Sequence, residues 1–314
     1  MAETGQIPDR STLAAFAGAV VIGGTNFIAV RFSNEELDPL FGAGIRFVAA
    51  ALLLFALMRL QRIRMPRSAE AVGPAVYGLL GFGVSYALLY YALVGLTAGT
   101  AAVFMAATPL VTLVLAVLHG QERFTARGVA GGVLAVVGIL VISLDSLGGD
   151  LRPVYLIAAL LGVVTVAESS VVVKGLPQTH PVTTNAVGMA AGGLLLVAAS
   201  LAFREDWVVP ERAKTWMVLA WLVVAGSVGL FVLFLFVIAR WTASATVYAL
   251  TLMPVVAVTL GALVADEPVT IELIAGGALV MTAVYVGALS GRTPKTATVP
   301  EAAPAVETAP GGGR

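Results

Sequence analysis

The amino-acid sequence predicts an all-α integral membrane protein with ten transmembrane helices in two inverted five-helix repeats. Composition is one reason, because hydrophobic residues make up 59% of the 314 residues and charged residues only 11%. In soluble domains about a quarter of the residues are charged. Internal duplication is the other reason. Residues 97–142 align with residues 242–287 without a gap, and a duplicated apolar unit is typical of membrane transporters built from repeats.

Ten apolar segments approach the length of about 20 residues that a helix needs to cross the hydrocarbon layer. They span roughly 12–31, 39–58, 71–93, 97–118, 126–143, 153–173, 181–203, 215–238, 242–264 and 271–289. Pro39, Pro153 and Pro181 stand at the starts of three segments, where a helix tolerates proline. Polar stretches at 59–67 and 204–214 separate other segments.

The first repeat, helices 1–5, is expected over residues 12–143 and the second, helices 6–10, over residues 153–289. Because five is an odd number, the second copy must enter the membrane from the opposite side, so the repeats are inverted. Residues 1–11 are expected to form a short cytoplasmic N-terminus. Residues 290–314 are rich in Pro, Ala, Gly and Thr, a composition that predicts a disordered cytoplasmic tail.

The distribution of Lys and Arg predicts the orientation. With the N-terminus in the cytoplasm, most basic residues fall on the cytoplasmic side, including the cluster of Arg59, Arg62, Arg64 and Arg67. The opposite orientation would reverse this bias, against the positive-inside rule. The sequence therefore predicts a multi-pass protein of the cell (inner) membrane with both termini in the cytoplasm.

Composition also limits the chemistry. The formal net charge is zero and the chain has no cysteine, which argues against nucleic-acid binding, disulfides and cysteine–metal sites. His119 and His180 are too few for a histidine-rich metal site, and we expect both at the membrane interfaces. The sequence contains no metalloprotease, hydrolase or phosphate-loop motif. We expect no cofactor, no metal and no enzymatic activity. The expected partners are a small-molecule substrate and the lipid bilayer, with a monomer and a homodimer both left open.

Two sets of motifs give the chain a family resemblance. The run Gly23-Gly24-Thr25-Asn26-Phe27 leads to Arg31, Asp38-Pro39-Leu40 and Arg46. A second set, Thr108-Pro109-Leu110, Glu122, Thr125 and Gly131-Gly132, recurs as Met253-Pro254-Val255, Glu267, Thr270 and Gly276-Gly277. In this order and in duplicate, the motifs resemble the EamA-domain branch of the drug/metabolite transporter superfamily over about residues 12–289. The resemblance implies a transporter with a central cavity, in a superfamily that carries amino acids, other metabolites, sugars and drugs.

Two ionisable residues fall well inside predicted spans, where a charge costs about 2.5–3.5 kcal/mol at mid-span. Arg46 offers a planar fork that binds a carboxylate or a phosphate. The alternative is a structural role, in which its guanidinium bonds free carbonyl groups or extends toward the outer interface. Glu168 would bind a substrate ammonium or take up a proton during transport, or it is a neutral acid bonded to a neighbouring span. A direct Arg46–Glu168 pair is not expected, because their predicted depths differ by about 12 Å.

Polar and aromatic residues of other spans complete the candidate site. Asn26 lies at about the depth of Arg46, and Tyr86 shares a helix face with Tyr90, which we expect near the outer interface. The candidate substrate-binding residues are Asn26, Arg46, Tyr86, Glu168, Ser169, Trp221, Tyr248 and Thr251. Glu168 is also the candidate for proton coupling. For the aromatic residues, the alternative is an interfacial or lipid-facing position.

Prolines occupy equivalent places in the fourth and ninth spans, at Pro109 and Pro254. Because proline removes a backbone hydrogen bond, it kinks a helix. A freed carbonyl within a membrane needs protein or a water-filled cavity, so both spans are expected to be kinked beside the pathway. The glycine pairs at 131–132 and 276–277 predict close packing of the fifth and tenth spans.

Glu122 and Glu267 each stand shortly before a helix start, where a carboxylate meets the positive end of the helix dipole. Thr125 and Thr270, three residues later, would cap the same helices. The two acidic residues are therefore expected to be structural, and a gate at each entrance is the functional alternative.

The predicted function is a secondary active or facilitative transporter, an exporter of amino acids or related small metabolites, that works by alternating access around a central cavity. The choice of amino acids follows from the family resemblance. Multidrug efflux is the alternative within this class. An intramembrane enzyme would need a nucleophile–base or metal constellation that the sequence lacks. A channel is disfavoured by analogy with transporters built from inverted repeats.

Overall fold

The computed structural model describes residues 9–120, 126–147, 153–174, 180–240 and 243–286. Every regular element within these ranges is helical, so the all-α prediction is confirmed for them. The predicted tail at 290–314, most of the segment 1–11, and both Glu122 and Thr125 lie outside the described residues.

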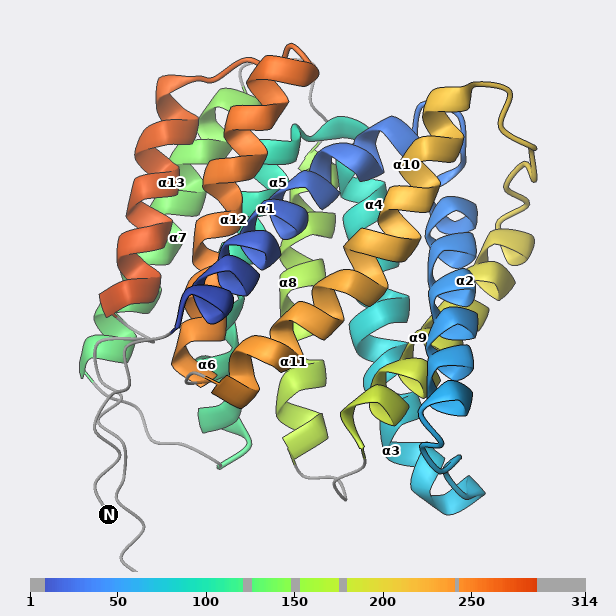
Figure 1. The fold of residues 1–314 in the computed structure, drawn as a ribbon. Helices are drawn as coiled ribbons and strands as arrows, with labels where there is room; N and C mark the ends of the chain where they lie inside the picture. The colour runs from blue at the N-terminus through green and yellow to red at the C-terminus, as the bar shows by residue number, and fades with distance from the viewer. Residues whose placement is uncertain (1–8, 121–125, 148–152, 175–179, 241–242, 287–314) are drawn as a thin grey trace, which may run out of the picture.

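The elements follow one another in two similar series (Figure 1). The first series is α1 (Arg10–Ser33), α2 (Pro39–Leu60), α3 (Ser68–Gly78), the π-helical turn η1 (Leu79–Val84), α4 (Ser85–Gly95), α5 (Ala98–Ala106), α6 (Thr108–Leu118) and α7 (Ala126–Leu147). The second is α8 (Pro153–Lys174), α9 (Pro181–Ala202), α10 (Ala213–Val223), the π-helical turn η2 (Val224–Gly229), α11 (Leu230–Arg240), α12 (Ala243–Val264) and α13 (Ile271–Val284).

Seven helical stretches within the described ranges are long and apolar enough to cross a bilayer. They are Arg10–Ser33, Pro39–Leu60, Ser68–Gly95, Ala98–Leu118, Pro153–Val172, Pro181–Ala202 and Ala213–Phe234. Shorter apolar helices cover Ala126–Ile142, Ala249–Val264 and Ile271–Val284. These lengths and compositions are those of a multi-span membrane protein.

Side chains at the helix starts satisfy backbone N–H groups that have no partner within the helix. Asp9 accepts from the backbone nitrogen of Thr12 (2.9 Å) at α1. Thr97 accepts from that of Thr100 (3.1 Å) at α5. Thr270 accepts from the backbone nitrogen of Leu273 (3.2 Å) at α13, which confirms Thr270 as a cap. Such caps fix where the helices begin.

The same π-helical turn occurs at the same place in both series. η1 begins at residue 79 and η2 at residue 224, and the flanking helices begin at 68 and 85 in the first series and at 213 and 230 in the second. Each element therefore starts 145 residues after its counterpart, the offset that aligns 97–142 with 242–287. π-helical turns are rare and often lie at functional sites, so their duplication directs attention to η1 and η2.

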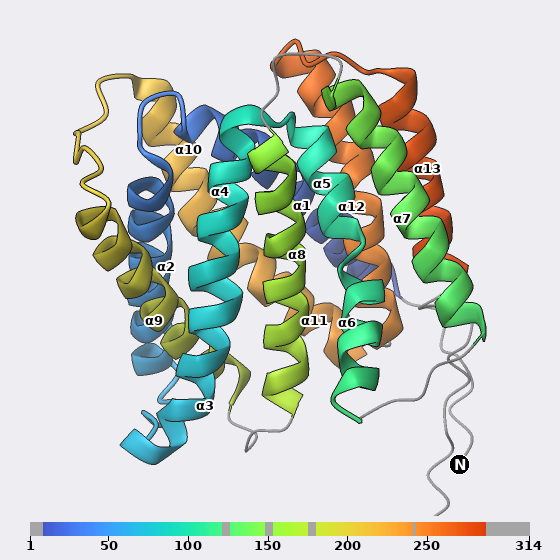
Figure 2. The same ribbon diagram turned by 180° about the vertical axis from the view of Figure 1, so that it is seen from behind.

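Corresponding helices of the two series run in opposite directions. In Figure 1, α1 rises from the lower end toward the upper end, whereas α8 descends. The view from behind in Figure 2 shows the same relation for α2, which descends, and α9, which rises. The start of α1 and the end of α13 lie near each other at the left, somewhat below mid-height in Figure 1.

The first series of helices, residues 10–147, and the second, residues 153–284, form the two halves of the molecule. Equivalent helices of the two halves also pack against each other. α2 contacts α9, and α7 contacts α13. The second contact is close, because a Cβ added at Gly138 would lie 2.8 Å from the backbone oxygen of Gly276. Gly276 thus serves the predicted close packing, but its partner is Gly138 and not the pair at 131–132. Gly132 has open space around it, since it lies on another face of α7.

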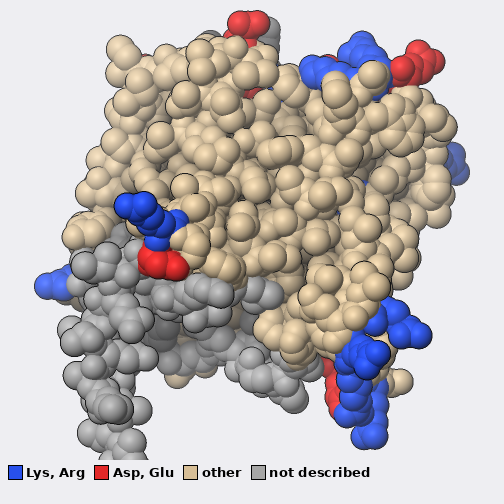
Figure 3. Space-filling view, viewed as in Figure 1, with Lys and Arg blue, Asp and Glu red and all other residues tan. Residues whose placement is uncertain are grey.

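On the face seen in Figure 3, charged side chains gather at the upper edge and at the lower right, and one group of both signs lies at the left near mid-height. A broad uncharged belt covers most of the surface between them. Large apolar side chains are exposed on the helices of this belt and elsewhere, among them Leu52, Val136, Leu161 and Ile274. Such an apolar surface would promote aggregation in water, and it fits the hydrocarbon layer of a bilayer.

Candidate functional site: a cavity lined by both halves

A cavity of about 240 Å³ lies among helices of both halves. α1, α2, α5, the first residue of α6 and the α3–η1–α4 stretch contribute from the first half, and α8, α11 and α12 contribute from the second. Most of the wall is apolar. The polar lining residues are Asn26, Arg46, Tyr77, Tyr86, Thr108, Ser169 and Ser170. None of the described lining residues is acidic.

Arg46 is the charged residue of this wall and is only 1% exposed. Its Nε donates to Ser227 Oγ (2.9 Å), its Nη2 to the carbonyl oxygen of Gly226 (3.1 Å) and its Nη1 to Tyr90 Oη (3.4 Å). All three acceptors are neutral, and the ion pairs found among the described residues do not include Arg46. Burying a charge without a counter-charge is costly, so its retention here points to function.

Two aromatic rings hold the guanidinium from the sides. Its Cζ lies 5.1 Å from the centre of the Phe47 ring and 5.4 Å from that of Tyr86. Cations within about 6 Å of a ring face are attracted by the ring quadrupole. Phe47 and Tyr86 also pack edge to face with centroids 4.6 Å apart. The orientation of Arg46 is thus fixed before any solute enters.

The carbonyl of Gly226 in η2 is a shared acceptor. Besides Arg46, it accepts from Asn26 Nδ2 (3.0 Å) of α1. A Cβ at this glycine would lie 2.2 Å from Asn26 Oδ1, so no larger residue fits beside it. Asn26 Oδ1 is itself buried without a hydrogen-bond partner among the described residues. Arg46, Asn26 and Gly226 therefore form a polar pole of the cavity.

The equivalent place in the other half has a different character. Gly81 of η1 corresponds to Gly226, and a Cβ there would lie 2.9 Å from Ser169 Oγ of α8. Ser169 thus faces η1 as Asn26 faces η2. Gly188 stands where the second half would carry a counterpart of Arg46, and its backbone closes against Gly78, whose added Cβ would lie 2.1 Å from the Gly188 oxygen. Among the described residues that line the cavity, the charged side chain lies at the pole of Arg46.

Four of the predicted site residues meet in this cavity: Asn26, Arg46, Tyr86 and Ser169. Tyr90, expected near the outer interface, is instead fully buried and contacts Arg46. The reason is that Tyr90 shares a helix face with Tyr86, and this face points inward.

The other predicted site residues lie elsewhere. Glu168 does not line the cavity, and its Oε1 lies 3.2 Å from Nε2 of His119 at the end of α6. Trp221 lies in a separate apolar groove beside α1, together with Thr25 and Met217. Thr251 is buried in α12 but is not among the lining residues. The side chain of Tyr248, also in α12, lies outside the described residues.

The reason for the displacement of Glu168 is geometric. Successive residues of an α-helix point about 100° apart, so Ser169 faces the cavity while Glu168 faces α6. The sequence indicated the depth of Glu168 but not its face.

The two prolines sit differently in their spans. Pro109 lies in the first turn of α6, and Ala107 separates this helix from α5. Pro254 lies inside α12, which continues through it. Thr108, beside Pro109, and Met253, beside Pro254, both line the cavity. Both prolines therefore lie next to the cavity wall.

Glu267 links the halves at the upper end of the molecule. It forms an ion pair with Arg31 of α1, and its two carboxylate oxygens accept from the backbone nitrogen of Ala98 (both 3.0 Å). It was expected to meet the helix that follows it, α13. It caps α5 instead, because the chain folds its carboxylate toward the other half. Arg31 and Ala98 are partners that sequence reasoning did not identify.

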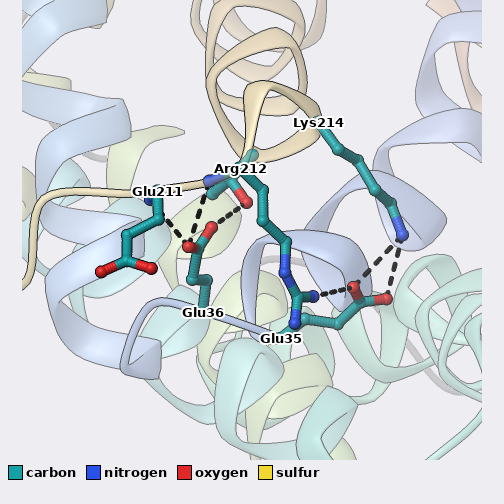
Figure 4. A network of polar contacts seen from close by, with 6 residues as sticks. Glu35, Glu36, Glu211, Arg212 and Lys214 are labelled. Carbon is teal, nitrogen blue, oxygen red and sulfur yellow. Dashed lines mark hydrogen bonds and ion pairs between the residues drawn. The ribbon is translucent and has the colours of Figure 1, made fainter.

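A second network of polar contacts lies at the same, upper end of the molecule (Figure 4). Glu35 accepts from Arg212 (3.3 Å) and pairs with Lys214 (3.1 Å). Glu36 accepts from the Thr215 hydroxyl and from the backbone nitrogens of residues 211 (2.7 Å) and 212 (3.2 Å). The connection between α1 and α2 is thus fastened to the start of α10.

The arrangement has the character of a binding site for a small solute. No cluster of three or more His, Cys, Asp or Glu that would hold a metal occurs within the described part of the chain. A buried cation, neutral hydroxyls and aromatic rings are suited to recognition.

Comparison with known proteins agrees with this character. The chain matches the model of the EamA-like transporter family over residues 10–144 and again over 153–288. It is 30% identical over 278 residues to the "Uncharacterized inner membrane transporter YedA" of Escherichia coli K12, covering 87% of this chain and 89% of that protein. It is 28% identical to an "Uncharacterized transporter" of Archaeoglobus fulgidus, covering 85% and 95%.

Two further similarities are more limited. The "Probable amino-acid metabolite efflux pump" of Escherichia coli K12 is 29% identical over 137 residues, 42% of either chain. A solved crystal structure matches with a TM-score of 0.63 at 19% identity, covering 89% of this chain and 96% of that one. At this identity, the second match supports the fold alone.

Proposed function

The chain belongs to the EamA-like transporter family, and from this premise we propose that it is a secondary active or facilitative transporter of the inner membrane for small metabolites. The observation that carries the proposal is the cavity of about 240 Å³, walled by both halves, with the buried Arg46 at one pole. The inner membrane is proposed because the relative named YedA is an inner membrane transporter.

The proposed architecture has ten membrane crossings in two inverted repeats. Seven long and three shorter apolar helices supply the crossings. The opposite directions of α1 and α8 and of α2 and α9 support the inversion (Figures 1 and 2). With both termini in the cytoplasm, as the distribution of Lys and Arg favours, the upper end of Figure 1 faces outward.

The proposed mechanism is alternating access around the cavity. At the upper end, Arg31, Glu267 and Ala98 join elements of the two halves, and Glu35 and its neighbours form a second tie (Figure 4). Release of a solute to that side would require these contacts to break. The turns η1 and η2 border or approach the cavity in equivalent places, so they are the proposed points of bending.

The proposed direction is export, with amino acids or related metabolites as the solutes. The partial similarity to an amino-acid metabolite efflux pump supports this choice. Multidrug efflux is the second candidate, favoured by the aromatic wall of Phe27, Phe82, Tyr86 and Phe234. For proton coupling, we propose Glu168 together with His119, since their side chains are paired.

The test is counterflow of radiolabelled metabolites in proteoliposomes, with and without a pH gradient. Saturable counterflow of at least one solute is expected. Flux that never saturates would point to a channel, and chemical conversion of the label would point to an enzyme. Protein-free liposomes and the Arg59→Gln variant, which changes an exposed residue at the end of α2, are the controls.

A further inference from the structure

We propose that the cavity selects solutes that carry a carboxylate and lack a cationic group. This inference rests on the proposed transport function. Of the amino acids and related metabolites proposed there, it keeps the related acids that lack an amino group. It starts from the charges of the wall: Arg46 is charged, and no described lining residue carries a negative charge. A site with one buried cation in surroundings of low dielectric attracts anions and repels cations.

Arg46 retains hydrogen-bonding capacity for a solute. A guanidinium has five N–H groups, and three of them are used by Ser227, Gly226 and Tyr90. One N–H remains on each Nη atom without a partner among the described residues. Two N–H groups on neighbouring nitrogens match the two oxygens of a carboxylate.

The cavity provides a poor place for an ammonium group. Among the described residues that line the cavity, Asn26 carries a buried acceptor, Oδ1, without a partner. The Asn26 and Arg46 side chains, however, donate to the same Gly226 oxygen. A cation at Asn26 would therefore stand beside the guanidinium. The hydroxyls of Ser169 and Ser170 donate to the Val166 carbonyl of their own helix (2.7 and 3.0 Å). They are neutral, so they offer an ammonium group no compensating negative charge.

The opposite pole supplies no counter-charge for an ammonium group among the described residues. Gly188, at the position equivalent to Arg46, packs against Gly78 and leaves no side chain there. The remaining wall is apolar or aromatic, with Phe27, Phe82 and Met253 among its residues. The cavity of about 240 Å³ is smaller than the roughly 300–1,000 Å³ of sites for drug-sized ligands. A small acid with an apolar or aromatic body fits this combination.

Four probes that share a phenyl ring on a two-carbon chain separate the possibilities. They are 3-phenylpropanoate, 3-phenylpropanamide, L-phenylalanine and 2-phenylethylamine. They present an anion, a neutral amide, a zwitterion and a cation on the same ring. Binding is measured as the shift in thermal unfolding of the purified full-length protein with increasing probe concentration. The acid is expected to bind at least tenfold more tightly than the amide and the zwitterion, and the amine weakest.

Two variants assign the selectivity to Arg46. Arg46→Gln should remove the preference for the acid over the amide, whereas Arg59→Gln, the same change at an exposed position of the same helix, should keep it. Asn26→Asp places a carboxylate beside the Gly226 carbonyl oxygen, which accepts from both Asn26 and Arg46. It should reverse the order, with the zwitterion and the amine gaining at least tenfold relative to the acid. This gain keeps the test decisive if Arg46→Gln does not fold.

The inference is overturned if the wild type binds the amine or the zwitterion as tightly as the acid, if none of the probes binds, or if Arg46→Gln keeps the acid preference. Counterflow separates these failures from failure of the transport proposal. Transport of amino acids or amines alone would leave the transporter proposal standing and reject the carboxylate preference. Acid binding that depends on Arg46, without transport of any solute, would support the carboxylate preference and reject the transporter proposal.

Discussion

The guanidinium of Arg46 in α2 donates to the carbonyl oxygen of Gly226 in η2 at 3.1 Å, so a buried cation of the first half is held by a π-helical turn of the second. The turn matters because its glycine lets Asn26 approach the same oxygen. Through this contact, any displacement of η2 changes the environment of the charge that lines the cavity.

Gly226→Ala is expected to damage the site, because the new Cβ would lie 2.2 Å from Asn26 Oδ1. We expect a loss of roughly 1–3 kcal/mol in stability, the usual cost of overpacking, and a drop in transport. Thermal unfolding and counterflow measure the two effects. Gly132→Ala is the matched control, since nothing lies within 4 Å of its added Cβ. Equal behaviour of the two variants would contradict the close approach at η2.

Glu267→Ala is expected to loosen the upper end of the molecule. It leaves Arg31 without its ion pair and the backbone nitrogen of Ala98 without its acceptor. An unsatisfied buried donor costs about 1–3 kcal/mol, and the partly exposed Arg31 adds little. Thermal unfolding in detergent should show this loss. Glu272→Ala, in the first turn of α13, is the control, and a loss of the same size there would speak against the linkage between halves.

The pH dependence of stability should include a term from Glu36. The Thr215 hydroxyl, aided by the backbone N–H groups of Glu211 and Arg212, lowers the pKa of Glu36 below its usual 4.5. The unfolded state therefore binds the proton more readily. The stabilisation is present above pH 4.5 and is lost as the pH falls through the lowered pKa of the folded state.

Glu36→Gln should therefore be less stable than the wild type at neutral pH, with the difference shrinking in acid. Thermal unfolding at a series of pH values measures it. Glu211→Gln is the control, because the Glu211 side chain points away from the network (Figure 4). A difference between wild type and Glu36→Gln that grows on acidification would show that the carboxylate does not stabilise this junction.

Glu168→Gln tests the proposed proton coupling. The change keeps the shape of the side chain but removes the acid that pairs with His119 at 3.2 Å. Counterflow should continue, because Glu168 does not line the cavity, while acceleration by a pH gradient should disappear. An unchanged response to the gradient would remove Glu168 from the coupling mechanism.

Much of the fold is readable in the sequence, because long apolar segments and a constant repeat offset are local or periodic signals. The family resemblance is confirmed by two matches along the chain. Asn26, Arg46 and Ser169 were identifiable because polar residues within spans face protein or cavity in preference to lipid.

The features that the sequence does not predict depend on contacts between distant segments. Glu267 caps a helix of the other half at Ala98, and no local sequence pattern indicates that partner. The π-helical turns leave no periodic signal, since each widens its helix over only six residues. Glu168 and Ser169 were assigned together, although adjacent helical residues face about 100° apart.

Gly188 stands in the second half where the first half has Arg46, so the two halves are not interchangeable. A tandem chain assembled from two first halves would place a guanidinium on each side of the hollow. The mutual repulsion of these charges would favour a dianion or keep the protein from closing. Two similar halves thus form a frame with an electrical polarity, and an anionic solute bound as proposed would have one preferred orientation in it.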